Sequence, residues 1–195
     1  MDRHLAPALL ELRRLLADAA IKVQPSLSFA LIGGLAVATW GAVRATADID
    51  FLADSDPSPL QVPEIRDRLK KFVEKEGGLA DWRVGGHDDP IPLLLRIELP
   101  DAYGVGADIL WAHKRWQREA LQRAPAVKVA DAEIPVLHPE DLILMKLDAG
   151  GPQDLLDVQA WLSCRPPEMN IERLKKTATR LRLGRALARC QREAR

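Results

Sequence analysis

Apolar and polar residues alternate with two different periods in the first quarter of the chain. Leucines at helical spacing predict an amphipathic helix over residues 3–22. The next apolar run, residues 26–32, is short and β-compatible, and it leads directly into Gly33-Gly34. We expect a buried helix after the glycines. An alternating strand then follows over residues 45–53.

The middle of the chain predicts both strands and helices, whereas its end predicts helices alone. The middle predicts a charged helix over 62–76, strands near 81–86, 93–99 and 105–111, a helix over 112–124, and a hairpin over 127–137. From His138-Pro139 onward only helical patterns follow, including a helix over 153–163 and one or two more within 170–192. The switch predicts two regions that pack together, 1–137 and 138–195.

These elements predict an α/β (α+β) fold, in which helices flank a small, mixed, twisted sheet and the C-terminal half is helical. Lys plus Arg and Asp plus Glu are each 28, so the net charge is zero and no global basic field attracts nucleic acid. A local basic face remains open, because arginines crowd residues 173–195. We read the two cysteines as reduced thiols and, with no signal peptide or membrane-length apolar run, expect a cytoplasmic protein.

The candidate chemistry lies around the first strand and the alternating strand. Asp48 and Asp50 point to the same side of a strand, about 6.5–7 Å apart along the backbone. Two such carboxylates suit Mg²⁺, which prefers oxygen ligands. Gly33-Gly34 has no Cβ atoms, so its backbone N–H groups can approach phosphate closely. Together the residues predict a site for divalent metal and a nucleoside triphosphate, although a plain turn and an exposed strand face are the simpler alternatives.

The stretch LIGGLAVATWGAVRATADIDFL resembles the first motif of the DNA polymerase β-type nucleotidyltransferase superfamily. The amino-acid sequence around Asp48 and Asp50 is similar to that of the small bacterial nucleotidyltransferases that include the AbiEii-like toxins. The stretch VLHPEDLILMKLDAGGPQDLLDVQAWL resembles a later motif of the same subgroup. The resemblance implies a nucleotidyltransferase-type sheet with an active cleft between it and the helical half.

The resemblance also implies roles for individual residues. Asp108, an acid within an apolar strand, would be the third metal ligand and general base; the alternative is an ion pair with Arg44 or Arg96. The remaining candidates would contact the nucleotide: Arg44, Thr46, Lys146, Asp154 and Asp157. Each has a structural alternative, such as a salt bridge for Arg44, a plain β-former for Thr46, or pairing of Lys146 with the two nearby acids.

The chain departs from the pattern that it resembles in one place. Proteins of that subgroup often carry arginines near the positions of Gly151 and Gln153, and this chain does not. Lys146 would therefore carry more of the phosphate contact. The resemblance implies Mg²⁺-dependent transfer of a nucleoside monophosphate from an NTP, such as ATP, to an acceptor that is a tRNA, a protein or a small molecule. A toxin role with an antitoxin partner is one version; a silent nucleotide sensor or protein-binding module is the alternative.

Overall fold

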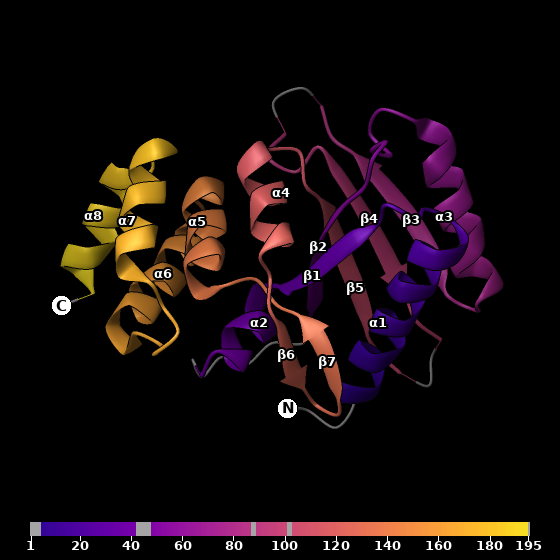
Figure 1. Ribbon diagram of the computed structural model, residues 1–195, viewed down its shortest axis with the longest axis horizontal. Helices are drawn as coiled ribbons and strands as arrows, with labels where there is room; N and C mark the ends of the chain where they lie inside the picture. Colours follow the sequence, from indigo (N-terminus) through magenta and orange to yellow (C-terminus); the bar gives the residue numbers. More distant parts are fainter. Residues whose placement is uncertain (1–4, 42–47, 87–88, 101–102, 195) are drawn as a thin grey trace.

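The computed structural model describes residues 5–41, 48–86, 89–100 and 103–194. Figure 1 shows a sheet wrapped by helices on the right and a group of helices on the left. The first helix, α1 (Leu5–Lys22), buries the leucines that set its helical period. It is followed by β1 (Ser28–Ile32), α2 (Gly33–Thr39) and β2 (Ile49–Asp54). The predicted strand–glycine–helix–strand unit is therefore confirmed, with the two glycines as the first residues of α2.

The remaining elements of the mixed region also follow the sequence pattern. They are α3 (Pro63–Lys75), β3 (Leu79–Val84), β4 (Leu93–Glu98), β5 (Gly106–Trp111), α4 (Arg115–Gln122), and the hairpin of β6 (Ala126–Val129) and β7 (Ala132–Pro135). Five strands form one sheet in the order β1-β2-β5-β4-β3. Among the described strand pairs of this sheet, β2 and β5 are parallel and the others antiparallel, so the sheet is mixed, as predicted.

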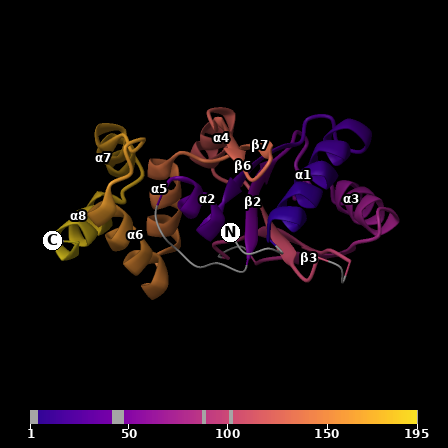
Figure 2. The same cartoon turned by 90° about the horizontal axis from the view of Figure 1, so that it is seen from below.

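One face of the sheet is covered and the other is open. Figures 1 and 2 show α1, α3 and α4 on the same side of the strands. On β5, Ala107, Ile109 and Trp111 are buried, whereas the intervening residues keep solvent contact. Successive residues of a strand face opposite ways, so this alternation separates the covered face from an open face. The open face carries the polar residues discussed below.

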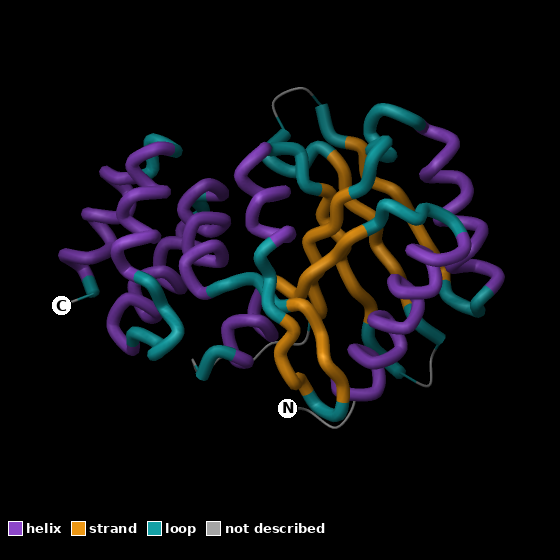
Figure 3. The backbone as a smooth tube through the Cα atoms, viewed as in Figure 1, coloured by secondary structure: helices purple, strands orange, loops and turns teal. Residues whose placement is uncertain are grey.

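Four helices follow the hairpin: α5 (Pro139–Ala149), α6 (Pro152–Cys164), α7 (Ile171–Arg180) and α8 (Gly184–Glu193). Figure 3 shows that this end of the chain is helical and lies beside the sheet. A single hydrophobic core runs through both parts. The division at residue 138 falls between β7 and α5, and it stays a prediction.

Two fully buried acids join the two parts. Glu140 and Asp141, at the start of α5, are only 1% and 0% exposed. Arg123, which ends α4, donates to Asp141, and Arg173 of α7 contacts both acids. We call these four residues the buried ion cluster. The sequence pattern predicted helices from His138-Pro139 onward and left a local basic face open over residues 173–195, but it did not predict this cluster.

The described helices include none that is both long and apolar enough to cross a membrane. Cys164 and Cys190 are free thiols. Burial raises the pKa of the Cys190 thiol, so it stays protonated at neutral pH.

Candidate functional site

A row of charged residues crosses the open face of the sheet. Asp50 of β2 is the register partner of Asp108 on β5. Asp108 is the partner of Arg96 on β4, and Arg96 is the partner of Asp81 on β3. Register partners point to the same face of a sheet. We call these four residues the charged row.

Gly33 brings the backbone of α2 against the row. Its φ angle is +66°, a left-handed conformation that glycine adopts without strain. A Cβ atom at this position would lie 2.0 Å from Asp50 Oδ2, far inside contact distance. Because Ile32 is the register partner of Asp50, the end of β1 delivers the glycine directly beside the carboxylate. The predicted proximity of the glycine turn and the acidic strand is therefore present.

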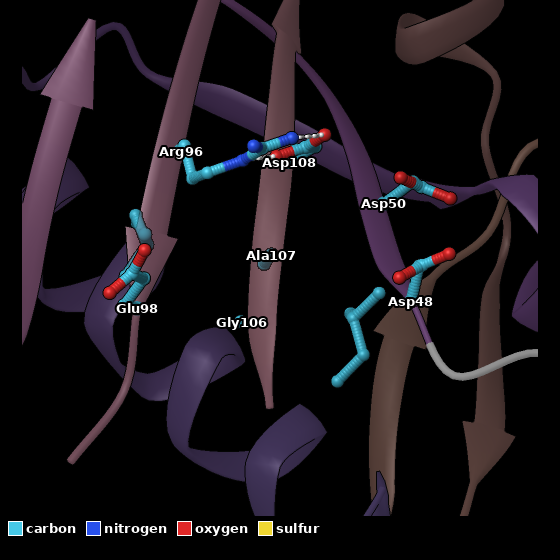
Figure 4. Close-up of a pocket in the computed structure, with 9 residues that line it drawn as sticks. Asp48, Asp50, Arg96, Glu98, Gly106, Ala107 and Asp108 are labelled. Atoms are coloured by element: carbon cyan, nitrogen blue, oxygen red, sulfur yellow. Dashed lines mark hydrogen bonds and ion pairs between the residues drawn. The ribbon is translucent and has the colours of Figure 1, made fainter. Parts of the chain in front are cut away.

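Asp108 makes the ion pair that the sequence had left open. Arg96 Nε lies 2.8 Å from Asp108 Oδ1, and a terminal nitrogen lies 2.9 Å from Oδ2. Figure 4 shows the two planar groups facing each other, with the Asp50 carboxylate turned away from them. This contact raises the pKa of Arg96 above its usual range, so the guanidinium remains charged. The Arg96 side chain is 61% exposed, so the pair lies at the surface of the open face.

A cavity of about 430 Å³ opens over this part of the sheet. It is lined by Asp48, Asp50 and Asp108, together with Arg96 and Glu98. Asp48 is exposed and directly precedes β2. The structure thus brings the three predicted carboxylates around one cavity. Arg44 and Thr46 lie outside the described residues.

A second cavity, of about 330 Å³, lies between the sheet and the C-terminal helices. Its lining includes Gly33, Asp50 and Asp108 on one side and Lys146 and Asp154 on the other. Gly34, the next residue of α2, is buried and does not line this cavity. The helical half therefore faces the charged row across a cleft, as the resemblance implied.

Lys146 of α5 is paired in this structure. Its Nζ atom lies 3.2 Å from Asp154 Oδ1 and 2.6 Å from Asp157 Oδ2, both on α6. Only 15% of the Lys146 side chain is exposed. The alternative in which Lys146 pairs with the two nearby acids is thus present in the structure. Lys146 and Asp154 nevertheless line the cleft.

The donor set suits a hard divalent cation, although the ligands do not converge here. Within the described residues, no three Asp, Glu, His or Cys side chains lie close enough together to hold a metal ion. Asp48, Asp50 and Asp108 nevertheless offer the carboxylate oxygens that Mg²⁺ prefers, around one open cavity. The Arg96 guanidinium already neutralises one of these carboxylates as a cation. The oxygen ligands of the site therefore suit Mg²⁺. In this structure the positive charge beside Asp108 is the Arg96 guanidinium.

No protein-family model and no curated protein sequence matches this chain. Solved structures do match. The solution structure of the antibiotic-resistance factor ANT(2'')-Ia, a nucleotidyltransferase, superposes with a TM-score of 0.51 at 18% identity, over 97% of this chain and 99% of that one. The chain has a nucleotidyltransferase-type fold. A putative nucleotidyltransferase from Thermotoga maritima gives the same TM-score at 16% identity, over 85% of this chain and 97% of that one.

In this nucleotidyltransferase-type fold, sequence reasoning overlooked two residues of the open face. Glu98 lines the larger cavity, and Asp81 ends the charged row. Both alternate with apolar residues on their strands, which was a usable signal for a solvent-facing side. Their place beside Arg96 and the larger cavity depends on strand order, which the sequence pattern did not provide.

Proposed function

We propose that the protein is an Mg²⁺-dependent nucleotidyltransferase, which moves a nucleoside monophosphate from an NTP to an acceptor and releases pyrophosphate. The observation that carries the proposal is the placement of Asp50. It is the register partner of Asp108, and its carboxylate lies against the backbone of Gly33. The two acids and the glycine also line the cleft below α5. A fold of nucleotidyltransferase type supports the same reading.

Each residue has a task in this proposal. Asp48, Asp50 and Asp108 would hold the metal, which when bound screens the charge of the triphosphate. The backbone of Gly33, which lines the cleft, would approach the phosphates because it has no Cβ atom, and Gly34 remains a proposed contact on sequence grounds. Lys146, on the opposite wall of the cleft, would contact phosphate after leaving its two acids. Arg44 and Thr46 remain proposed nucleotide contacts on sequence grounds, and Asp154 and Asp157 position Lys146.

The transfer itself is a substitution at phosphorus. An acceptor oxygen forms a bond to the α-phosphorus, and the bond from that phosphorus to the bridging oxygen of pyrophosphate breaks. The acceptor hydroxyl loses its proton to the Asp108 carboxylate, and the electron pair of the broken bond leaves with pyrophosphate. Arg96 now donates to both oxygens of Asp108 and stabilises the ionised form, so Asp108 would accept a proton more readily once Arg96 has moved away.

Label transfer tests the proposal. The protein is incubated with each NTP, labelled at the α-phosphate, together with Mg²⁺, total RNA and cell lysate, and the labelled product is identified. We expect one class of molecule to become labelled with wild-type protein and not with the Asp48→Ala variant. Asp131→Ala, at an exposed turn of the hairpin, is the matched control and should transfer label normally. Equal labelling by wild type and Asp48→Ala would refute the assignment.

A second function is favoured by two sets of ion pairs. Arg96 occupies Asp108, and two acids occupy Lys146, which would suit a catalytically silent protein that binds nucleotide or a protein partner. Thermal unfolding separates the two functions from a binding module without nucleotide affinity. Stabilisation by NTP only in the presence of Mg²⁺ supports an enzyme or a sensor, and label transfer then distinguishes these two.

The candidate classes of acceptor come from the sequence resemblance alone. A tRNA, a protein and a small molecule each remain within the proposal, and the labelling experiment includes all three classes. Membership of the AbiEii-like subgroup, a toxin role and an antitoxin partner remain predictions, and so does the cytoplasmic location.

A further inference from the structure

Arg96 stands between two acids on neighbouring strands. β4 is flanked by β5 and β3, and the register places Asp108 opposite Arg96 on one side and Asp81 opposite it on the other. Side chains at directly opposed positions lie within contact range of a long residue such as arginine. The guanidinium can therefore reach either carboxylate from the same backbone position.

The two acids differ in their present contacts. Asp108 receives two hydrogen bonds from Arg96. Asp81 is exposed, and among the described residues it has no hydrogen-bond or ion-pair partner. The Arg96 side chain is 61% exposed, so little packing opposes its rotation from one acid to the other. Glu98, two residues along β4, also faces this region, but Figure 4 shows it directed away from the guanidinium.

A metal ion and a guanidinium compete for the same oxygens. Arg96 donates one hydrogen bond to each oxygen of Asp108, so a cation that binds there meets a positive group already in contact with both oxygens. Two cations at one carboxylate also repel each other. Binding is easier if the displaced guanidinium has another acid to contact.

We propose that Arg96 is a positioning residue with two resting places: it holds Asp108 while the metal is absent, and it moves to Asp81 when a divalent cation binds Asp108. The proposal rests on the metal site of the proposed function. It makes Asp81 the second partner of Arg96, although Asp81 lies on the strand at the opposite edge of the sheet from β1 and the glycine turn. The row would thus keep Asp108 neutralised in both states.

Manganese binding, followed by the paramagnetic resonance signal of free Mn²⁺ without nucleotide, tests the first half. Arg96→Gln should bind Mn²⁺ with an about fivefold lower Kd than wild type, because an exposed ion pair no longer competes. Arg83→Gln is the matched control, since it removes an exposed arginine of the same face outside the charged row. Its Kd should equal that of wild type, which separates local competition from a change in net charge.

A double-mutant cycle tests the second half. Asp81→Asn should raise the Mn²⁺ Kd about threefold in the wild-type background, because the displaced guanidinium has lost its second partner. In the Arg96→Gln background the same substitution should have no effect. An equal effect of Asp81→Asn in both backgrounds would overturn the movement of Arg96 to Asp81 and would assign Asp81 a direct electrostatic role instead.

The outcomes distinguish this proposal from the proposed function. Mn²⁺ binding that is lost in Asp48→Ala but unchanged in Arg96→Gln would retain the metal site and overturn the role of Arg96. Absence of Mn²⁺ binding in wild type, Arg96→Gln and Asp81→Asn alike would overturn the exchange at Asp108, whereas the proposed function would still be decided by label transfer in the presence of NTP. Circular dichroism of each variant confirms that the fold is retained, as expected for substitutions at exposed positions.

Discussion

Two regions of the molecule place a pair of acids beside arginine, and they do so in opposite ways. In the buried ion cluster, Glu140 and Asp141 are almost completely inaccessible, and two arginines from α4 and α7 contact them. In the charged row, Asp50 and Asp108 line open cavities, and Arg96 pairs with Asp108 from a side chain that is 61% exposed.

The difference separates a buried set of charges that joins helices from an open set that we propose to bind metal. A fully buried carboxylate is tolerated only with permanent partners, and removing a partner leaves an uncompensated charge. A carboxylate at an open cavity can exchange one cation for another, because water solvates it during the exchange. Proximity of acids to arginine therefore does not by itself identify a binding site, because exchange of cations also needs access to solvent.

The largest effect that would sharpen this contrast is on transfer. Asp50→Asn should lower the rate of nucleotide transfer by about 10²- to 10³-fold, because it removes a charge that would hold the metal at the transition state. Its free energy of unfolding should change by less than about 1 kcal/mol, because the residue lines a cavity instead of filling the core. Labelling assays and urea unfolding measure the two quantities. A variant that unfolds much more readily than wild type would place Asp50 with the structural acids.

Asp141→Asn should do the reverse. We expect the free energy of unfolding to fall by about 3 kcal/mol, because Arg123 and Arg173 lose their shared buried partner. Urea unfolding measures it, with Asp148→Asn as the control. Asp148 pairs with Lys114 at 2.5 Å, but both side chains remain partly exposed, so its loss should cost less than about 1 kcal/mol. Equal costs for the two variants would remove the distinction between buried and open pairs.

Gly33→Ala tests how closely the backbone approaches the charged row. The substitution should lower the free energy of unfolding by about 2 kcal/mol for two reasons. Alanine is strained in the left-handed backbone conformation of this position, and its Cβ atom would clash with the Asp50 carboxylate. Gly41→Ala is the matched control: its φ angle is +87°, and a Cβ atom there would meet nothing within 4 Å. It should therefore show the strain alone, about 1 kcal/mol. Equal losses would mean that Asp50 moves aside without cost.

The smallest effect concerns Asp54, at the far end of β2. Burial raises the pKa of this carboxyl, despite its contact with Arg118. A raised pKa in the folded state favours the protonated form, so ionisation at neutral pH costs stability. Asp54→Asn should therefore be slightly more stable than wild type at pH 7. This advantage should disappear as the pH falls through the folded-state pKa, measured by thermal unfolding between pH 7 and pH 3. A constant advantage at all pH values would contradict the assignment.

Local pattern was enough for most of the fold and for part of the site. The helical spacing of the first leucines, the alternation around Asp50 and the run after Pro139 each encode an element directly, and those elements are confirmed. Strand order is set by contacts between distant segments, so the pairing of Arg96 with Asp108 appeared only as one of two options. The buried ion cluster was overlooked for the same reason. Charges at the start of α5 and α7 look solvent-exposed until the helices are packed together.

The central claim is that the open acids form a site for metal and nucleotide together. Calorimetric titration of wild-type protein with a non-hydrolysable NTP, with and without Mg²⁺, tests it most directly. The account predicts binding in the presence of Mg²⁺, little binding without it, and loss of the Mg²⁺-dependent part in Asp50→Asn. Binding of equal strength with and without Mg²⁺, or unchanged in Asp50→Asn, would contradict it.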